Sequence, residues 1–178
     1  MNKVATIGTN VVELFRPEGT SEPSGLGCLV IIARHHGLEL SVAQLVHDNY
    51  LVDQEVSVPE LLKAARSAGL RAQTVRLDWH GLNQLDKALP AIVRLNNGRS
   101  MVLLRLEGGE SGPSRAVLQD PNAGDDALLM IDRARFEGAW TGEVILVDGG
   151  LALHGGPQSL QVAVGTPQPM NAKGTEAR

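Results

Sequence analysis

The fold of this 178-residue chain is decided by the stretch SGLGCLVIIARHHG, residues 24–37. Apolar side chains occupy nearly every position of residues 26–33, which is typical of a helix that is buried on all sides. Gly37 follows as a natural C-cap, because glycine readily adopts the left-handed conformation that ends many helices. We therefore predict a buried central helix from Gly25 to His36, against which the rest of the chain must pack.

Two more helices are predicted after this stretch, each from a capping box at its start. The boxes are SVAQ at residues 41–44 and SVPE at residues 57–60. In this motif the serine and the glutamine or glutamate three residues later can satisfy one another's backbone N–H groups. The second of these helices is expected to end at Gly69.

Beyond Gly69 the pattern changes to short segments with strand character. Five strands are predicted, at residues 72–77, 91–95, 101–106, 116–119 and 144–147. A short helix is expected at 82–85, and Asn97-Gly98 between the second and third strands predicts a hairpin. Helices followed by a run of mostly antiparallel strands predict an α+β fold.

Composition and charge exclude several classes of protein. The chain carries one cysteine and a net charge of −4, so neither a disulfide framework nor a basic surface for nucleic acid is expected. Its longest apolar stretch, residues 26–33, is far shorter than the roughly 20 residues that cross a bilayer. We expect one soluble domain at 24–148, an N-terminal lead-in at 1–23 and a flexible linker or tail at 149–178.

No catalytic or metal-binding motif is visible from spacing alone. Cys28 is the one candidate thiol nucleophile, but it lies inside the predicted buried helix, whereas a reactive thiolate needs a cationic neighbour or a helix N-terminus. The histidines lack metal-site spacing, and the glycine pairs lack the lysine of a phosphate-binding loop. We therefore expect no metal and no cofactor.

Six short motifs occur in chain order between residues 24 and 148. They are SGLGCL at 24–29, ARHHG at 33–37, LLKAA with AGL at 61–70, LPAI at 89–92, DPNAG at 120–124, and Phe136 followed by WTG at 140–142. Together they resemble the bacteriocin-processing cysteine peptidases, family thirty-nine of the cysteine class. The resemblance implies a papain-like fold, in which a central helix packs on an antiparallel sheet.

The resemblance also assigns positions to the catalytic machinery, and most of them differ from the active family. Ser24 stands where the nucleophilic cysteine begins the central helix, and Cys28 matches a second, structural cysteine. Ser100 replaces the histidine that opens a strand. Glu18 falls at the oxyanion glutamine, where an acid would repel a developing oxyanion. Only Asp120 remains, and a serine without a base is a poor nucleophile, so we expect no peptidase activity.

Degenerate domains of this kind resemble the modules at the N-terminus of type I secretion ABC exporters. The resemblance implies a cytoplasmic domain at the bacterial inner membrane, beside the membrane and ATPase domains of the same transporter. It also implies that the domain binds or positions an unfolded secreted repeat protein, without nucleic acid. The candidate binding residues are Ser24, Ser100 and Asp120 of the vestigial groove, with Tyr50 and Trp79 as stacking aromatics.

Alternatives stay open at this point. An active leader peptidase, cutting after a double glycine, would need Ser24 or Cys28 as its nucleophile. A regulatory module would instead contact the transporter's ATPase domain and never the substrate. Asp120 serves equally well as a turn cap before Pro121, and Trp140 is expected in the core.

Overall fold

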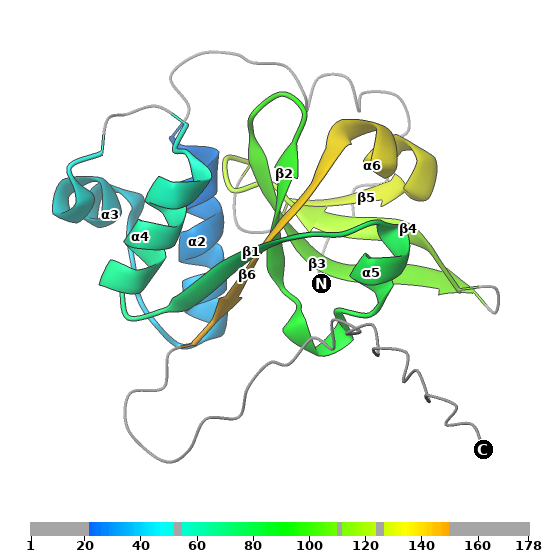
Figure 1. Ribbon diagram of the computed structural model, residues 1–178, viewed down its shortest axis with the longest axis horizontal. Helices are drawn as coiled ribbons and strands as arrows, with labels where there is room; N and C mark the ends of the chain where they lie inside the picture. Colours follow the sequence, from blue (N-terminus) through cyan, green and yellow to red (C-terminus); the bar gives the residue numbers. More distant parts are fainter. Residues whose placement is uncertain (1–21, 52–54, 110–111, 124–126, 150–178) are drawn as a thin grey trace, which may run out of the picture.

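A twisted sheet with helices on both faces makes up the computed structural model, which describes residues 22–51, 55–109, 112–123 and 127–149 (Figure 1). The predicted lead-in and tail lie almost entirely outside these residues, and Glu18 lies outside them as well. None of the helices in the described ranges is long and apolar enough to cross a bilayer.

The sheet has six antiparallel strands in the order β1-β6-β2-β3-β4-β5. The strands are β1 Arg71–Arg76, β2 Ala91–Leu95, β3 Ser100–Gly109, β4 Gly112–Gln119, β5 Leu128–Asp132 and β6 Trp140–Asp148. The predicted hairpin joins β2 to β3, and Gly98 takes the left-handed conformation at its turn, with φ of 85°. The last strand, β6, lies between β1 and β2, which leaves β1 and β5 as the edges of the sheet.

One face of the sheet is covered by three helices, α2 Ser24–His35, α3 Val42–Asn49 and α4 Val58–Ser67. The central helix α2 contacts β3 and β2 directly, and both α3 and α4 pack against it. The residues that meet in this layer include Leu26, Leu29, Ile32, Ile92, Val102 and Ile145. All six are fully buried, and burial of each such side chain contributes about 1.5–3 kcal/mol.

The opposite face carries a second core around the aromatic residues. The short helices α5 Trp79–Asn83 and α6 Arg133–Ala139 cover it, with the 3-10 turn η1 at Asp86–Ala88. The ring of Phe136 meets the edge of Trp79 at 5.8 Å between centroids and lies 5.2 Å from Trp140. Trp140 is 7% exposed, which confirms its predicted place in the core.

Both predicted capping boxes mark helix starts. Ser41 Oγ accepts a hydrogen bond from Gln44 N at 3.2 Å, at the start of α3. At the start of α4 the Glu60 carboxylate accepts from Ser57 N at 2.8 Å and from Ser57 Oγ at 2.6 Å. Both bonds lower the pKa of Glu60, and the bond from the Ser57 side chain has the larger effect.

The α+β fold class is confirmed, and so is the papain-like packing of a central helix on an antiparallel sheet. Strand β5 and helix α6 were not predicted. The residues of β5, LLMID, show no alternation of apolar and polar side chains, and α6 buries only Phe136, so neither carries a periodic pattern. The helix expected at 82–85 lies at Trp79–Asn83 instead. Asp78 sets that earlier start, since its side chain accepts from Gly81 N at 2.8 Å.

Candidate functional site

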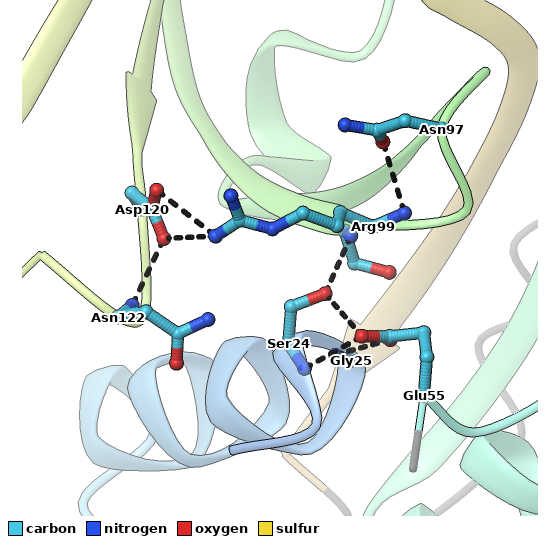
Figure 2. A network of polar contacts seen from close by, with 8 residues as sticks. Ser24, Gly25, Glu55, Asn97, Arg99, Asp120 and Asn122 are labelled. Carbon is cyan, nitrogen blue, oxygen red and sulfur yellow. Dashed lines mark hydrogen bonds and ion pairs between the residues drawn. The ribbon is translucent and has the colours of Figure 1, made fainter. Parts of the chain in front are cut away.

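The candidate site lies at the N-terminus of the central helix α2, which is capped by a residue distant in sequence (Figure 2). Pro23 precedes the helix and provides no side-chain cap. The Glu55 carboxylate takes that role: its Oε2 accepts from Ser24 N at 2.9 Å and from Ser24 Oγ at 2.8 Å, and its Oε1 accepts from Gly25 N at 2.9 Å. A carboxylate at this place satisfies N–H groups that have no partner within the helix and complements the helix dipole.

Ser100 meets Ser24 from the sheet side. As the first residue of β3, Ser100 donates its backbone N–H to Ser24 Oγ at 2.7 Å. The Ser24 hydroxyl therefore accepts from Ser100 and donates to Glu55 at the same time. Ser24 is 1% exposed and Ser100 is fully buried, and the Ser100 hydroxyl oxygen has no hydrogen-bond partner among the described residues. The two serines thus join helix to sheet in the interior.

Asp120, at the end of β4, is held by the arginine that precedes Ser100. Arg99 Nη2 lies 3.2 Å from each of the two carboxylate oxygens of Asp120. The carboxylate also accepts from Asn122 N at 2.9 Å, so Asp120 caps the turn that follows it. Since the Asp120 side chain is 8% exposed, the ion pair neutralises a largely buried charge.

The Asp120 turn is brought against α2 by a close approach at Gly27. A Cβ atom built on Gly27 would lie 2.7 Å from the Cβ of Pro121, closer than real Cβ atoms come. Only glycine leaves room there for the proline. The GLG pattern at residues 25–27 therefore places the Asp120 turn beside the first turns of α2.

Cys28 lies on α2 just beyond this network and is fully buried. Burial raises the pKa of its thiol well above the usual value, and the charges of Glu55 and Asp120 raise it further. A protonated, enclosed thiol is neither nucleophile nor metal ligand at neutral pH. The structure confirms that Cys28 is a core thiol, and its low reactivity stays a prediction.

Three of the five candidate binding residues come together, and two lie elsewhere. Ser24 and Ser100 are in contact, and Asp120 joins them through Arg99. All three are buried. Their contact with substrate stays a prediction. Tyr50 is 93% exposed at the end of α3, outside the network.

The prediction for Trp79 needs correction. Trp79 is 4% exposed in the second core, on the other face of the sheet, and its Nε1 donates to Pro113 O at 3.3 Å. No open ring face is left there to stack on a bound chain. Trp79 was expected near a loop, where it could stack on substrate, but its ring lies in the core and the carbonyl of Pro113 accepts from its N–H.

Sequence reasoning missed two residues that build the site, Glu55 and Arg99. Arg99 stands next to Ser100 in the hairpin turn, and that adjacency was the one available signal. Glu55 reaches Ser24 across 31 residues, and no local pattern predicts such a contact. The arrangement provides carboxylates and serines but, among the described residues, no imidazole that hydrogen-bonds to Ser24.

Comparison with known proteins agrees with this geometry. Residues 15–150 match the family model described as the Peptidase C39 family. The cyclolysin secretion/processing ATP-binding protein CyaB of Bordetella pertussis is 36% identical over 124 residues, which are 69% of this chain and 16% of that protein. The alpha-hemolysin translocation ATP-binding protein HlyB of Escherichia coli O157:H7 is 29% identical over 127 residues, 71% of this chain and 17% of that protein.

A solved structure shows the same fold. It is the crystal structure of the N-terminal peptidase C39 like domain of the toxin secretion ATP-binding protein from Vibrio parahaemolyticus. Its TM-score is 0.62 at 27% identity, and the alignment covers 74% of this chain and 99% of that one. The chain therefore spans a small part of the curated relatives, which are several times longer, and nearly all of this single solved domain.

Proposed function

Because this chain belongs to the peptidase C39 family, we propose that it is a catalytically inactive member that binds the unfolded substrate of a type I secretion ABC exporter. In this proposal the domain lies at the N-terminus of the transporter, on the cytoplasmic face of the inner membrane. It holds the secreted protein near the transporter without cutting it.

The observation that carries the proposal is the state of the Ser24 hydroxyl. The hydroxyl donates to the Glu55 carboxylate at 2.8 Å and accepts from the Ser100 N–H at 2.7 Å, so the protein itself occupies both its donor and its acceptor. Peptide cleavage needs a nucleophile with an adjacent general base, usually histidine, and an oxyanion site. By the resemblance, Ser24 takes the place of the nucleophile and Ser100 takes the place of the general base. The negatively charged Glu55 carboxylate occupies the N-terminus of α2. A scissile carbonyl could reach Ser24 Oγ only if Glu55 moved away.

The transporter context rests on the similarity to longer proteins. CyaB and HlyB are described as secretion and translocation ATP-binding proteins, and this chain matches about one-sixth of each. The corresponding domain from Vibrio parahaemolyticus is N-terminal in a toxin secretion ATP-binding protein. These matches support a substrate-handling domain as one part of an exporter.

Loss of peptidase activity is tested with a synthetic double-glycine leader peptide. The purified chain is incubated with the peptide and the mixture is followed by mass spectrometry, with Ser24→Ala as the matched control. We expect no product in either sample. Cleavage by the wild-type chain that disappears in Ser24→Ala would instead identify an active leader peptidase.

Substrate binding is tested by titration calorimetry with the C-terminal region of a secreted calcium-binding repeat protein. We expect binding to the unfolded, calcium-free form and at least tenfold weaker binding to the calcium-folded form. Equal affinity for the two forms, or no binding to either, would contradict the proposal. Unchanged substrate association after deletion of residues 1–148 from a full transporter, with altered ATP turnover, would favour the regulatory alternative.

A further inference from the structure

The edge strand β1 has a neighbour on one side only, among the residues that the structure describes. It pairs with β6 in an uninterrupted antiparallel register from Arg71↔Asp148 to Arg76↔Glu143. Leu77 N donates to Gly142 O at 2.9 Å, which continues the same register by one residue. Because antiparallel ladders alternate, the backbone groups of residues 72, 74 and 76 point away from β6. They form a row of donors and acceptors at the edge of the sheet.

Most side chains along this edge are exposed, and the charged residues of β1 itself are both basic. Four of the six β1 residues are exposed, Arg71 and Arg76 among them. The segment that runs from α4 through β1, residues 58–76, carries four bases against the single acid Glu60. Its charge of +3 contrasts with the net charge of −4 for the whole chain.

Asp78, two residues beyond the end of β1, caps α5 through a backbone hydrogen bond. Two further acids lie behind the edge. Asp148 pairs with Arg71 at 3.1 Å and Glu143 stands opposite Arg76, but both belong to β6, one strand further in. The side chains of Arg71 and Asp148 are 75% and 52% exposed, and such surface pairs contribute at most about 1 kcal/mol. An incoming carboxylate can therefore compete for Arg71.

The other edge of the sheet lacks this charge. Strand β5 and helix α6 together, residues 128–139, carry two bases and two acids. Those four side chains already pair with one another, Arg133 with Glu137 at 3.0 Å and Arg135 with Asp132 at 3.4 Å. The β1 edge is therefore positively charged and the β5 edge is neutral, which favours β1 as the binding place of an anionic strand.

We propose that the free edge of β1 binds an acidic, extended polypeptide segment as an additional strand. The main-chain groups of residues 72, 74 and 76 hydrogen-bond to its backbone, and Arg71 and Arg76 attract its carboxylates. This inference rests on the proposed function and assigns a place to the substrate. A calcium-free repeat protein fits, because the side-chain ligands for calcium in proteins are largely carboxylates.

Arg71 and Arg76 lie on opposite faces of the sheet, because successive side chains of a strand alternate. The charge requirement is therefore tested with a fluorescein-labelled ten-residue peptide in which pairs of threonines alternate with pairs of aspartates, which places carboxylates on both faces of the added strand. We expect its affinity for the chain, measured by fluorescence anisotropy, to be at least tenfold higher than that of the same peptide with asparagine for aspartate. The double variant Arg71→Glu/Arg76→Glu should bind at least tenfold more weakly than wild type. The matched control Arg105→Glu/Arg115→Glu, on β3 and β4, should bind as wild type does. Equal losses in both variants would show a general effect of net charge and overturn the inference.

The strand-pairing requirement is tested at Thr74. Proline at this position removes an outward N–H but leaves the backbone hydrogen bonds to β6. The weak bond from Thr74 Oγ1 to Val144 O at 3.4 Å is lost equally in Thr74→Pro and Thr74→Ala. Thr74→Pro should therefore abolish peptide binding while Thr74→Ala retains it. If Thr74→Pro does not fold, as judged by circular dichroism, the amide exchange of Thr74 in the wild-type chain replaces it. Slower exchange with peptide bound supports the inference, and unchanged exchange overturns it.

Failure of this inference differs from failure of the proposed function. If Arg71→Glu/Arg76→Glu binds the calcium-free secreted protein as tightly as wild type, the β1 edge is not the site but the proposed function stands. If the wild-type chain itself does not bind that protein, the proposed function fails. Binding to vesicles of anionic phospholipid that is tighter than binding to the peptide, and that is lost in Arg71→Glu/Arg76→Glu, would make this edge a membrane contact and overturn the inference.

Discussion

The hydroxyl oxygen of Ser24 accepts a hydrogen bond from the backbone nitrogen of Ser100 at 2.7 Å, across 76 residues of the chain. The bond joins the first turn of α2 to the first residue of β3. By the resemblance to the active peptidases, these are the positions expected for the nucleophile and the histidine. In this chain they fasten the central helix to the sheet.

The variant Ser24→Cys should not gain a reactive thiol. The Glu55 carboxylate beside position 24 and the burial of that position both oppose formation of a thiolate. We expect alkylation by iodoacetamide at pH 7.5 to be at least tenfold slower than that of free cysteine, as measured by peptide mapping, which separates position 24 from Cys28. Removal of the nearby charge in Ser24→Cys/Glu55→Gln should raise the rate. Alkylation of Ser24→Cys as fast as that of free cysteine would contradict this account.

Loss of Arg99 should destabilise the fold more than loss of a surface arginine. Arg99→Ala leaves the Asp120 carboxylate buried without its cation, which should lower the free energy of unfolding by about 2–3 kcal/mol. This loss is smaller than that for a fully buried pair, because the Arg99 side chain is 23% exposed. Arg71→Ala, which breaks an exposed pair, should cost at most about 1 kcal/mol. Urea denaturation of both variants checks the difference. Equal losses would mean that the Arg99–Asp120 pair contributes no more than an exposed one.

Two glycine-to-alanine changes should have opposite effects. Gly27→Ala forces a methyl group against Pro121 and should lower the free energy of unfolding by about 1–3 kcal/mol. Gly138→Ala, in α6, meets nothing within 4 Å, and should leave stability unchanged or raise it by up to about 1 kcal/mol through helix propensity. Thermal melting of both variants makes the comparison. A Gly27→Ala variant as stable as wild type would show that the Asp120 turn moves aside freely.

The capping box at Glu60 should give the protein an acid-sensitive contribution to stability. The folded-state pKa of Glu60 is lowered from 4.5 by the bonds from Ser57, so the unfolded state binds more protons as the pH falls. The contribution is therefore present above about pH 4.5 and is lost as the pH falls through the folded-state pKa. The stability gap between wild type and Glu60→Gln should be larger at pH 7 than at pH 3, as measured by urea denaturation. Ser57→Ala should reduce this pH dependence, and a gap that is the same at both pH values would refute it.

Local sequence signals predicted those parts of the fold whose causes are local. The apolar run of α2, the capping serines at 41 and 57 and the Asn97-Gly98 turn each depend on residues within a few positions of one another. Strand β5 and helix α6 were missed because LLMID does not alternate and α6 has one buried side chain, Phe136. Trp79 was placed near a loop, since nothing in its own neighbourhood shows that Phe136 and Pro113 enclose it.

The sequence by itself determined that Cys28 is a core residue and that a buried helix packs on an antiparallel sheet. Its resemblance to the active peptidases also led us to expect serines at the positions of the nucleophile and the histidine. Only the tertiary structure decided how these two serines and Asp120 are held. Glu55 and Arg99 meet Ser24 and Asp120 through hydrogen bonds that span 31 and 21 residues, and these contacts exist only after the helix and the sheet have packed. Spacing along the chain carries no record of them, because the packing of distant apolar faces sets which polar groups meet at the end of α2.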